Sequence, residues 1–490
     1  MSASEPVPIR KLPSGVPGLD EILGGGIAEY SFNIIAGAPG TGKTTLAEQI
    51  IFANATAKRP ALHFTVLGEP PFKMLRYQQQ FEFFDIARVG TEVRFLNLSQ
   101  EALDRNFDLV LERIAREVEE ANAGLVVVDS FRTMIPAIGR NVDAELALQY
   151  FVQRLALRLT TWESTTFLVG EYAEHEARSP VFTVADGIIW LLNEVERNST
   201  QRKLRVTKAR GQAPLPGLHA MRISTAGVEV FPRYSRRTEQ HLVDPPSERL
   251  SMGVPGLDDM MGGGVPRGDS VLVAGPTGAG KSMLALQFAA AGLEVGDRSV
   301  IAVFEERPAT YVATAARLGI DLEKLIAEGE IEVQYLRIAD VSAEETLHGI
   351  RNAVERIGAK RVVIDSLTGF ESVLAPSFRL DFRDSYYRLL QDLSRLGIST
   401  LSTVERSESQ GFLDFSSFSA SIISDDILAM RYVELGGELR RVLAVVKMRG
   451  SDHSRDLRLY TVDADGLHVG EVLHQYRGII TGVPEPNEGP

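Results

Sequence analysis

Residues 12–47 read LPSGVPGLDEILGGGIAEYSFNIIAGAPGTGKTTLA, and residues 250–285 read LSMGVPGLDDMMGGGVPRGDSVLVAGPTGAGKSMLA, which aligns with the first segment without a gap. Further matches follow in the same order, with KARG beginning at Lys208 in the first copy and KMRG beginning at Lys447 in the second. An internal repeat decides the architecture before any local pattern does. Because the matches extend over nearly the whole chain of 490 residues, the sequence describes one duplicated domain.

The duplication sets the domain organisation that we expect. Two domains of roughly 240 residues each have the usual size of a folding unit, whereas one hydrophobic core rarely grows to the full length. The segment that joins the copies, RYSRRTEQHLVDPPSE, is polar and contains Pro245 and Pro246, which is typical of an exposed linker. We therefore predict a first domain over residues 1–243, a second over residues 244–482 and a flexible tail over residues 483–490.

Helical and strand patterns alternate within each copy. Val110, Ile114 and Val118 share one helical face directly before the apolar run 125–128, and the second copy repeats this pattern before residues 362–364. Helices that alternate with buried strands favour a mostly parallel sheet covered on both faces. The predicted fold class is α/β, with two tandem P-loop domains, each a mostly parallel sheet flanked by helices.

The composition is that of an ordinary globular protein, with 44% hydrophobic and 24% charged residues. The net charge of −13 argues against a broad basic surface for duplex DNA, so we do not expect nucleic acid as a partner. No apolar stretch is long enough to span a bilayer, and the opening MSASEPVPIRK lacks a signal pattern, so we expect a cytoplasmic protein without membrane contact. The absence of cysteine suits that compartment.

Both copies carry the pattern G-x-x-x-x-G-K-[ST] between an apolar strand and a helical segment, over residues 37–44 and 275–282. Glycines allow backbone N–H groups to approach a triphosphate closely, the helix start adds its dipole, and Lys43 and Lys281 would reach the β- and γ-phosphates of ATP. A chance glycine-rich turn is the alternative, and two matches in register argue against it. The residues expected to bind ATP are Gly40, Thr41, Gly42, Lys43, Thr44 and Thr45 in the first copy, and Thr277, Gly278, Ala279, Gly280, Lys281, Ser282 and Met283 in the second.

A magnesium ion is expected beside each triphosphate. The hydroxyls of Thr44 and Ser282 would bind it directly. Asp129 and Asp365 each end a strand of aliphatic residues, where a carboxylate can meet the metal or its waters. A single aspartate after a strand is more often a loop or cap residue, but the matching positions in both copies favour a role at the metal.

The two copies differ at the end of the next strand. The second copy has Glu305 and Glu306 there, and the first has Leu67 and Gly68, with Glu69 following. A carboxylate that faces the γ-phosphate can orient and polarise the attacking water. We therefore interpret Glu305, then Glu306, as the catalytic residue of the second domain. Glu69 is either its counterpart or a solvated turn residue, so slow or absent hydrolysis in the first domain is our hypothesis.

A lysine and an arginine lie two residues apart near the end of each copy. They are Lys208 and Arg210 in the first copy, and Lys447 and Arg449 in the second. Side chains two apart on a strand share a face, so both could point at one anion. Such pairs are usually solvated, but recurrence in both copies of a phosphate-binding domain favours contact with ATP.

Taken together, these motifs resemble the KaiC-like ATPases, the RecA-fold family that includes the cyanobacterial circadian clock protein. GVPGLD near each domain start, both phosphate loops, FEE at 304–306, YVE at 432–434 and KMRGS at 447–451 carry the resemblance, which covers about residues 10–482. It implies a double-ring homohexamer with ATP held between neighbouring subunits. It also implies that the next subunit's nucleotide is contacted by Lys208, Arg210, Lys447 and Arg449.

The clock protein of this family phosphorylates itself on an adjacent serine and threonine in its second domain. Counting back from Tyr432, that pair falls on Ser421 and Ile422, so the serine is kept and the threonine is absent. Ser424 is a nearby alternative. The resemblance therefore implies a serine autokinase activity at Ser421 or Ser424.

The function that we predict is an ATP-hydrolysing, ring-forming regulatory protein that acts with protein partners. One alternative is a RecA-like nucleic-acid motor or recombinase, because the fold alone does not decide function. The other is a nucleotide-gated scaffold, in which hydrolysis is slow and ATP mainly closes the ring.

Overall fold

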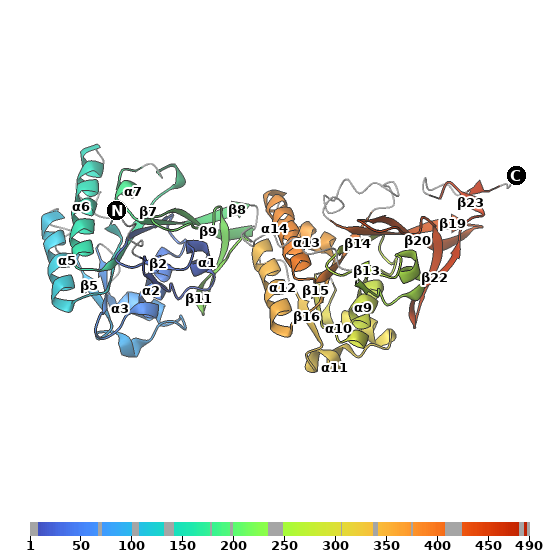
Figure 1. Ribbon diagram of the computed structural model, residues 1–490. Helices are drawn as coiled ribbons and strands as arrows, with labels where there is room; N and C mark the ends of the chain where they lie inside the picture. Colours follow the sequence, from blue (N-terminus) through green and yellow to red (C-terminus); the bar gives the residue numbers. More distant parts are fainter. Residues whose placement is uncertain are drawn as a thin grey trace, which may run out of the picture. The chain divides into compact units, whose positions relative to one another are not determined.

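The computed structural model in Figure 1 describes residues 8–66, 71–99, 107–131, 142–176, 179–196, 199–233, 248–304, 306–336, 342–373, 376–406, 424–479 and 485–487. The chain divides into two compact units, residues 1–235 and residues 236–490. Each unit is described by itself below.

A nine-stranded sheet forms the centre of the first unit, in the order β11-β10-β9-β8-β3-β7-β6-β4-β5. The strands from β8 to β5 are parallel, and β9, β10 and β11 continue the sheet antiparallel. Their bounds are β3 Phe32–Gly37, β4 Ala61–Thr65, β5 Val93–Asn97, β6 Leu125–Asp129, β7 Thr165–Glu171, β8 Gly187–Glu196, β9 Ser199–Ala209, β10 His219–Ser224 and β11 Gly227–Phe231. A separate small sheet pairs β1 Lys11–Leu12 with β2 Ile27–Ala28.

The second unit repeats this sheet, in the order β16-β15-β17-β18-β14-β19-β20-β21-β22. The strands are β14 Ser270–Gly275, β15 Ser299–Val303, β16 Ile331–Tyr335, β17 Arg361–Asp365, β18 Ser399–Glu405, β19 Asp426–Leu435, β20 Glu438–Met448, β21 Arg458–Asp463 and β22 Gly466–Val472. Two-stranded sheets pair β12 Arg249–Leu250 with β13 Val265–Pro266, and β23 Tyr476–Arg477 with β24 Glu485–Pro486.

Helices cover both faces of each sheet (Figure 1). The first unit contains α1 Leu19–Leu23, α2 Lys43–Asn54, α3 Pro71–Gln78, α5 Phe107–Ala121, α6 Val142–Thr161 and α7 Val181–Val184. The second contains α8 Pro255–Met260, α9 Lys281–Ala291, α10 Pro308–Arg317, α11 Leu322–Ala327, α12 Ala343–Ile357, α13 Leu367–Val373 and α14 Pro376–Arg395. The prediction of two tandem α/β domains is confirmed.

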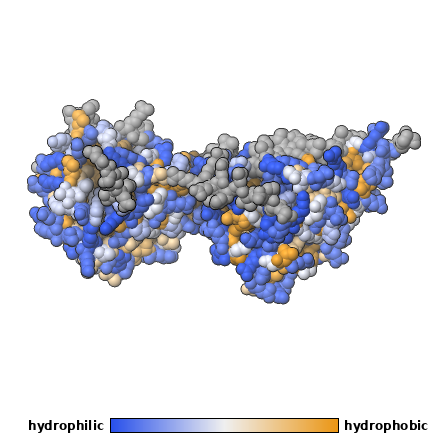
Figure 2. All heavy atoms as spheres, in the orientation of Figure 1, coloured by the Kyte–Doolittle hydropathy of each residue, from blue (hydrophilic) through white to orange (hydrophobic). Residues whose placement is uncertain are grey.

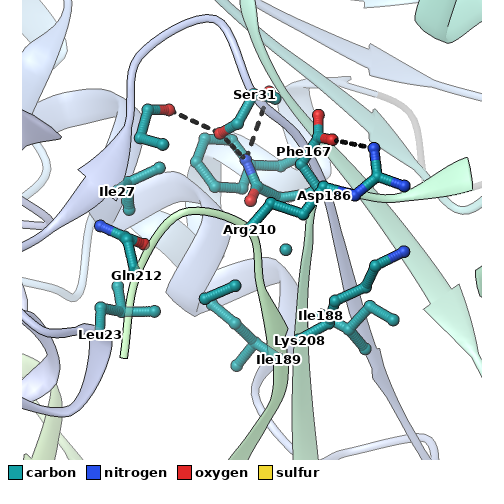
Figure 3. Close-up of a pocket in the computed structure, with 14 residues that line it drawn as sticks. Leu23, Ile27, Ser31, Phe167, Asp186, Ile188, Ile189, Lys208, Arg210 and Gln212 are labelled. Carbon is teal, nitrogen blue, oxygen red and sulfur yellow. Dashed lines mark hydrogen bonds and ion pairs between the residues drawn. The ribbon is translucent and has the colours of Figure 1, made fainter. Parts of the chain in front are cut away.

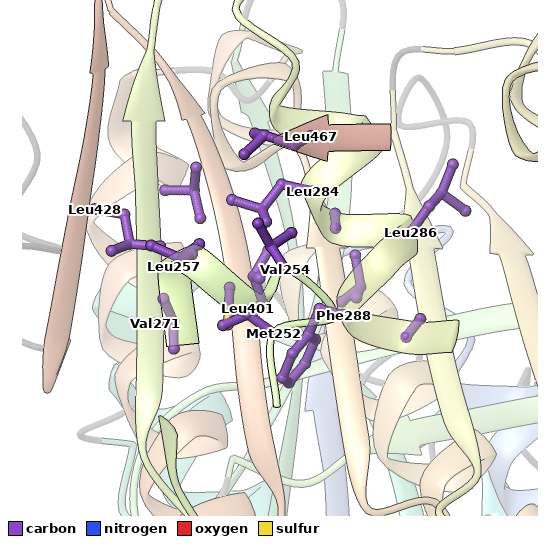
Figure 4. Close-up of a cluster of buried hydrophobic side chains, with 14 of the residues drawn as sticks. Met252, Val254, Leu257, Val271, Leu284, Leu286, Phe288, Leu401, Leu428 and Leu467 are labelled. Carbon is purple, nitrogen blue, oxygen red and sulfur yellow. The ribbon is translucent and has the colours of Figure 1, made fainter. Parts of the chain in front are cut away.

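Strand periodicity and helix periodicity together build the cores. The consecutive residues Ile34 and Ile35 of β3 are both fully buried, and they belong to clusters on opposite faces of the sheet because side chains alternate along a strand. In α12, Leu347, Ile350 and Val354 form the buried face, as their spacing predicts. Figure 4 shows the corresponding cluster of the second unit, in which side chains of α8 and α9 pack over the central strands.

The surface of each unit is mainly hydrophilic on the face shown in Figure 2, with separate apolar patches. Among the residues that the structure describes, no helix combines the length and the apolar character needed to cross a membrane.

A buried polar pair distinguishes the first unit from the second. Glu48 of α2 and His63 of β4 are both fully buried, with 3.4 Å between His63 Nδ1 and Glu48 Oε1. Burial raises the pKa of Glu48 well above its usual range, with a contribution from the charge of Asp129, and burial lowers the pKa of His63 to about 3. Burial therefore disfavours the charged form of both groups, and neither side chain makes a hydrogen bond among the described residues.

Replacing this pair with its counterparts in the second copy, Leu286 and Ile301, is expected to stabilise the first unit. Apolar side chains fill the space without the desolvation cost, so Glu48→Leu with His63→Ile is expected to raise the free energy of unfolding by about 2 kcal/mol. Calorimetric unfolding of the full chain measures the change. Glu48→Leu alone is the control, because it leaves the imidazole buried, and a double variant less stable than wild type would contradict the account.

Candidate nucleotide sites

The phosphate loop of the first unit connects β3 to α2. Gly40 and Gly42 have φ angles of 75° and 95°, a backbone conformation that residues other than glycine rarely adopt. Among the residues that the structure describes, no side chain caps the N-terminus of α2, so its first N–H groups are available to a ligand. Lys43 is 7% exposed, and its Nζ donates to the carbonyl of Ala38 at 2.8 Å, which places the ammonium over the loop. Such a loop can hold an anion.

The second loop has the same construction between β14 and α9. Gly278 and Gly280 have φ angles of 78° and 97°, and no side chain caps α9. Lys281 Nζ donates to the carbonyls of Gly275 at 2.9 Å and Pro276 at 2.8 Å. The structure thus repeats the predicted strand, loop and helix in both units.

Each loop lies beside a buried aspartate. Thr44 Oγ1 donates to Asp129 Oδ2 at 2.5 Å, at the end of β6. Burial raises the pKa of Asp129 to about 6, while the Thr44 hydrogen bond and the Lys43 charge act in the opposite direction. The predicted metal residues of the first copy are therefore brought together.

Asp365, at the end of β17, occupies the matching position in the second unit. Its side chain accepts hydrogen bonds from the hydroxyls of Thr403 and Ser282. Burial raises its pKa, and its Oδ2 atom has no hydrogen-bond partner among the described residues. A hydroxyl beside a buried carboxylate with an unpaired oxygen fits a hard divalent cation such as Mg²⁺.

The predicted catalytic glutamates are only partly described. Glu69 and Glu305 lie outside the described residues. Glu306 is exposed and lies three residues after the end of β15, whose last residue, Val303, is the register partner of Asp365. It therefore follows the strand at the same edge of the sheet at which Asp365 lies.

Sequence reasoning missed a second pair of carboxylates at this edge. Glu171 ends β7 and is paired in register with Gly37, and Glu405 ends β18 and is paired with Gly275. Thr277 of the second phosphate loop donates its hydroxyl hydrogen to Glu405. The signal in the sequence is that both strands end in glutamate, in TTFLVGE and STLSTVE.

The basic pairs do not lie beside the phosphate loop of their own domain. Arg210 N donates to the carbonyl of Asp186 at 3.0 Å, and Asp186 precedes β8, whose first residue is level with Asn33 near the start of β3. The phosphate loop follows the other end of β3, so the two sites are separated by the length of a six-residue strand, roughly 17 Å.

Polar partners hold each basic side chain at that far edge, and Figure 3 shows Lys208, Arg210 and Asp186 of the first unit. Lys208 Nζ donates to the carbonyl of Thr183 at 3.1 Å, and Arg210 Nη1 donates to Asp186 Oδ1 at 3.0 Å. In the second unit, Lys447 Nζ donates to the carbonyl of Ser424 at 2.6 Å and Arg449 Nη1 to Asp425 Oδ1 at 3.2 Å. Each basic pair is thus held away from the phosphate loop of its own domain.

Of the two predicted phosphorylation sites, the structure describes only Ser424. Ser421 lies outside the described residues. Ser424 is 1% exposed, so its hydroxyl is inaccessible in this conformation.

The second unit carries additional acids behind its basic pair. Asp426, which has Gly187 as its counterpart in the first sheet, is fully buried, and neither carboxylate oxygen has a hydrogen-bond partner among the described residues. Burial raises its pKa to about 8, and the charges of Asp269 and Asp425 add to this shift. Burial likewise raises the pKa of Asp269 to about 7, with Asp425 contributing. Arg249 and the backbone of Arg449 oppose the shift of Asp426.

This cluster is expected to make stability depend on pH. The folded pKa of Asp426 lies above the unfolded value, so its contribution to stability is full at acid pH and is lost as the pH rises from about 4 to about 8. Asp426→Asn, which mimics the protonated acid, is expected to raise the free energy of unfolding at pH 8 by about 2 kcal/mol and to raise it much less at pH 5. Urea denaturation at both pH values measures this, with the exposed Asp465→Asn as control. An equal effect at the two pH values would contradict the assignment.

The fold and the duplicated sites define a tandem P-loop protein of RecA-like fold. A model of the family described as "ATPase: KaiC" matches residues 12–235 and 250–474. The chain belongs to the KaiC family of ATPases, and the predicted resemblance is confirmed. Membership implies nucleotide binding.

Several circadian clock proteins are similar to this chain over nearly its whole length. The "Circadian clock protein KaiC3" of Synechocystis sp. is 28% identical over 486 residues, which cover 97% of this chain and 95% of that protein. The "Circadian clock oscillator protein KaiC" of Picosynechococcus sp. is 28% identical over 490 residues, covering 97% and 92%. The protein of that name from Thermostichus vulcanus is 27% identical over 487 residues, covering 97% and 92%.

Proposed function

We propose that each half of the chain binds one ATP with Mg²⁺ at its phosphate loop, and that the chain hydrolyses ATP as part of a ring. The observation that carries this proposal is the duplicated constellation of a loop lysine, a hydroxyl at the helix start and a buried aspartate at one edge of each sheet. A triphosphate needs these groups together, because positioning and charge stabilisation supply nearly all of the catalysis of phosphoryl transfer.

The residues of each site have distinct roles. Backbone N–H groups of the loop and of the helix start surround the phosphates, and Lys43 and Lys281 exchange their loop carbonyls for phosphate oxygens. Thr44 and Ser282, with the neighbouring aspartates, would hold Mg²⁺, which would supply positive charge against the phosphates. In the second domain, Glu305 or Glu306 orients the attacking water.

The ring follows from the position of the basic pairs. Lys208 and Arg210, like Lys447 and Arg449, lie at the sheet edge opposite their own phosphate loop. Cations so placed serve a nucleotide only when it is held by another subunit. Heterologous contacts of this kind close into a ring when the rotation between subunits closes. We therefore propose a homohexamer that holds ATP between neighbouring subunits.

The test combines assembly with turnover. Light scattering with and without ATP and Mg²⁺ is expected to show ATP-dependent assembly to six chains, with phosphate release from the assembled form. A monomer with ATP bound would contradict the ring. Assembly without phosphate release would favour the nucleotide-gated scaffold, and tight, steeply salt-dependent binding of single-stranded DNA in a filter assay would favour the nucleic-acid motor.

Regulatory partners and a serine autokinase activity stay predictions. Both derive from the resemblance to the clock proteins, whose names place them in circadian timing. Mass spectrometry after incubation with ATP would detect phosphate on Ser421 or Ser424.

A further inference from the structure

The first domain carries an unassigned carboxylate beside its phosphate loop. Glu171 ends β7, the strand next to β3, and its register partner is Gly37, the residue at which the phosphate loop begins. The following residue, Tyr172, donates its N–H to the carbonyl of Gly37 at 3.2 Å, which fixes the end of β7 against the loop. The backbone of Glu171 is therefore held beside the start of the phosphate loop.

Glu171 also lies near the aspartate of the same site. Strands β6 and β7 are paired in register with Asp129 opposite Val169, so Glu171 lies two residues beyond the partner of Asp129. The residue is therefore at the sheet edge that carries both the phosphate loop and the metal aspartate.

The matching residue of the second domain is held differently. Glu405 accepts a hydrogen bond from the hydroxyl of Thr277, the third residue of the second phosphate loop. The first loop has Pro39 at that position, and proline offers no hydroxyl. The two glutamates thus share a strand position but not an environment.

The difference matches the loss of carboxylates elsewhere in the first domain. The second domain has Glu305 and Glu306 at the end of β15, and the first has Leu67 and Gly68 at those positions. We propose that Glu171 orients the attacking water in the first domain and accepts its proton, a role that a glutamate at the end of β15 performs in the second. This inference rests on the proposed binding of ATP at the first phosphate loop.

The step conserves atoms and charge. The water oxygen forms a bond to the γ-phosphorus while the bond from that phosphorus to the β,γ-bridging oxygen breaks, and the electron pair leaves with ADP. The proton released by the water passes to the Glu171 carboxylate and from there to solvent, because the residue is exposed.

The experiment isolates the first domain with Lys281→Ala, which removes the phosphate lysine of the second. In this background, Glu171→Gln is expected to lower ATP turnover by about 100-fold and to change the dissociation constant of ATP by less than about threefold. Glutamine keeps the size of the side chain, and the site is exposed, so the fold is retained. The control is Glu174→Gln, three residues further along and paired with Arg205 at 3.6 Å, which is expected to leave turnover unchanged.

Three results would overturn the inference. Turnover of Glu171→Gln within about twofold of its parent would exclude the catalytic role, since loss of a base costs far more. A larger loss from Glu69→Gln would assign the role to that residue. A parent that binds ATP but does not hydrolyse it would remove the activity itself. A parent that fails to bind ATP would instead contradict the proposed function, so the two failures are distinguished by the binding measurement.

Discussion

Replacing Lys281 by alanine is expected to weaken ATP binding at the second site by about 100-fold, and Lys43→Ala is expected to do the same at the first. Each ammonium is the cation over its own loop, at 2.8 Å from a loop carbonyl, and charge-assisted bonds to phosphate contribute about 1.5–3 kcal/mol each. Because the two loops lie in separate units, each variant should lose one of the two affinities and keep the other.

Titration with a fluorescent ATP analogue measures both affinities. The matched control is Lys324→Ala, which removes a lysine that is 65% exposed on α11 and distant in sequence from both loops. Unchanged binding in both loop variants would show that these loops do not hold the phosphates.

Two variants that each lack second-domain turnover are expected to regain it when they are mixed. Lys281→Ala lacks the loop lysine of the second site, and Arg449→Ala lacks a cation at the opposite edge of the same sheet. If Arg449 serves the neighbour's nucleotide, a mixed ring contains interfaces that pair an intact loop from one variant with an intact arginine from the other. Random assembly of equal amounts should restore about a quarter of the second-domain turnover.

Phosphate release by the mixture, above the average of the separate proteins, measures this recovery. Mixing Lys281→Ala with a double variant, Lys281→Ala with Arg449→Ala, is the control, because no interface in that mixture has an intact loop. Absence of recovery in mixed rings, with exchange of subunits verified by mass, would place Arg449 at its own subunit's nucleotide and contradict the ring.

The parts of the site that could be predicted are those whose functional residues follow one another in the sequence. The loop glycines, Lys43 and Thr44 follow one another, and the strand before them and the helix after them are evident from apolar patterning. Duplication adds Asp129, because a strand that ends in aspartate occurs at matching places in both copies. The fold class follows from the same alternation of helices and strands.

The parts that could not be predicted depend on the order of strands in the sheet. Lys208 and Arg210 were expected to share a strand face, but their distance from the loop follows from β9 running antiparallel to β8, which returns the chain to the start of β3. Glu171 is far from the loop in sequence and reaches it because β7 is the neighbour of β3. The pair of Glu48 and His63 was missed because polar residues in an apolar helix and strand give no local signal of where they meet.

The two halves are therefore not equivalent. The first contains the buried pair Glu48 and His63, and the second has the apolar residues Leu286 and Ile301 at those positions and an acidic cluster around Asp426. Two sites with the same phosphate-binding geometry can then differ in stability and in response to pH.

The number of ATP molecules bound per chain tests the central claim most directly. Equilibrium dialysis of the wild-type chain against radiolabelled ATP and Mg²⁺, at concentrations well above the dissociation constants, is predicted to give two ATP per chain. A plateau at one would leave a single functional loop, and the absence of binding would contradict the assignment of both halves as ATP sites.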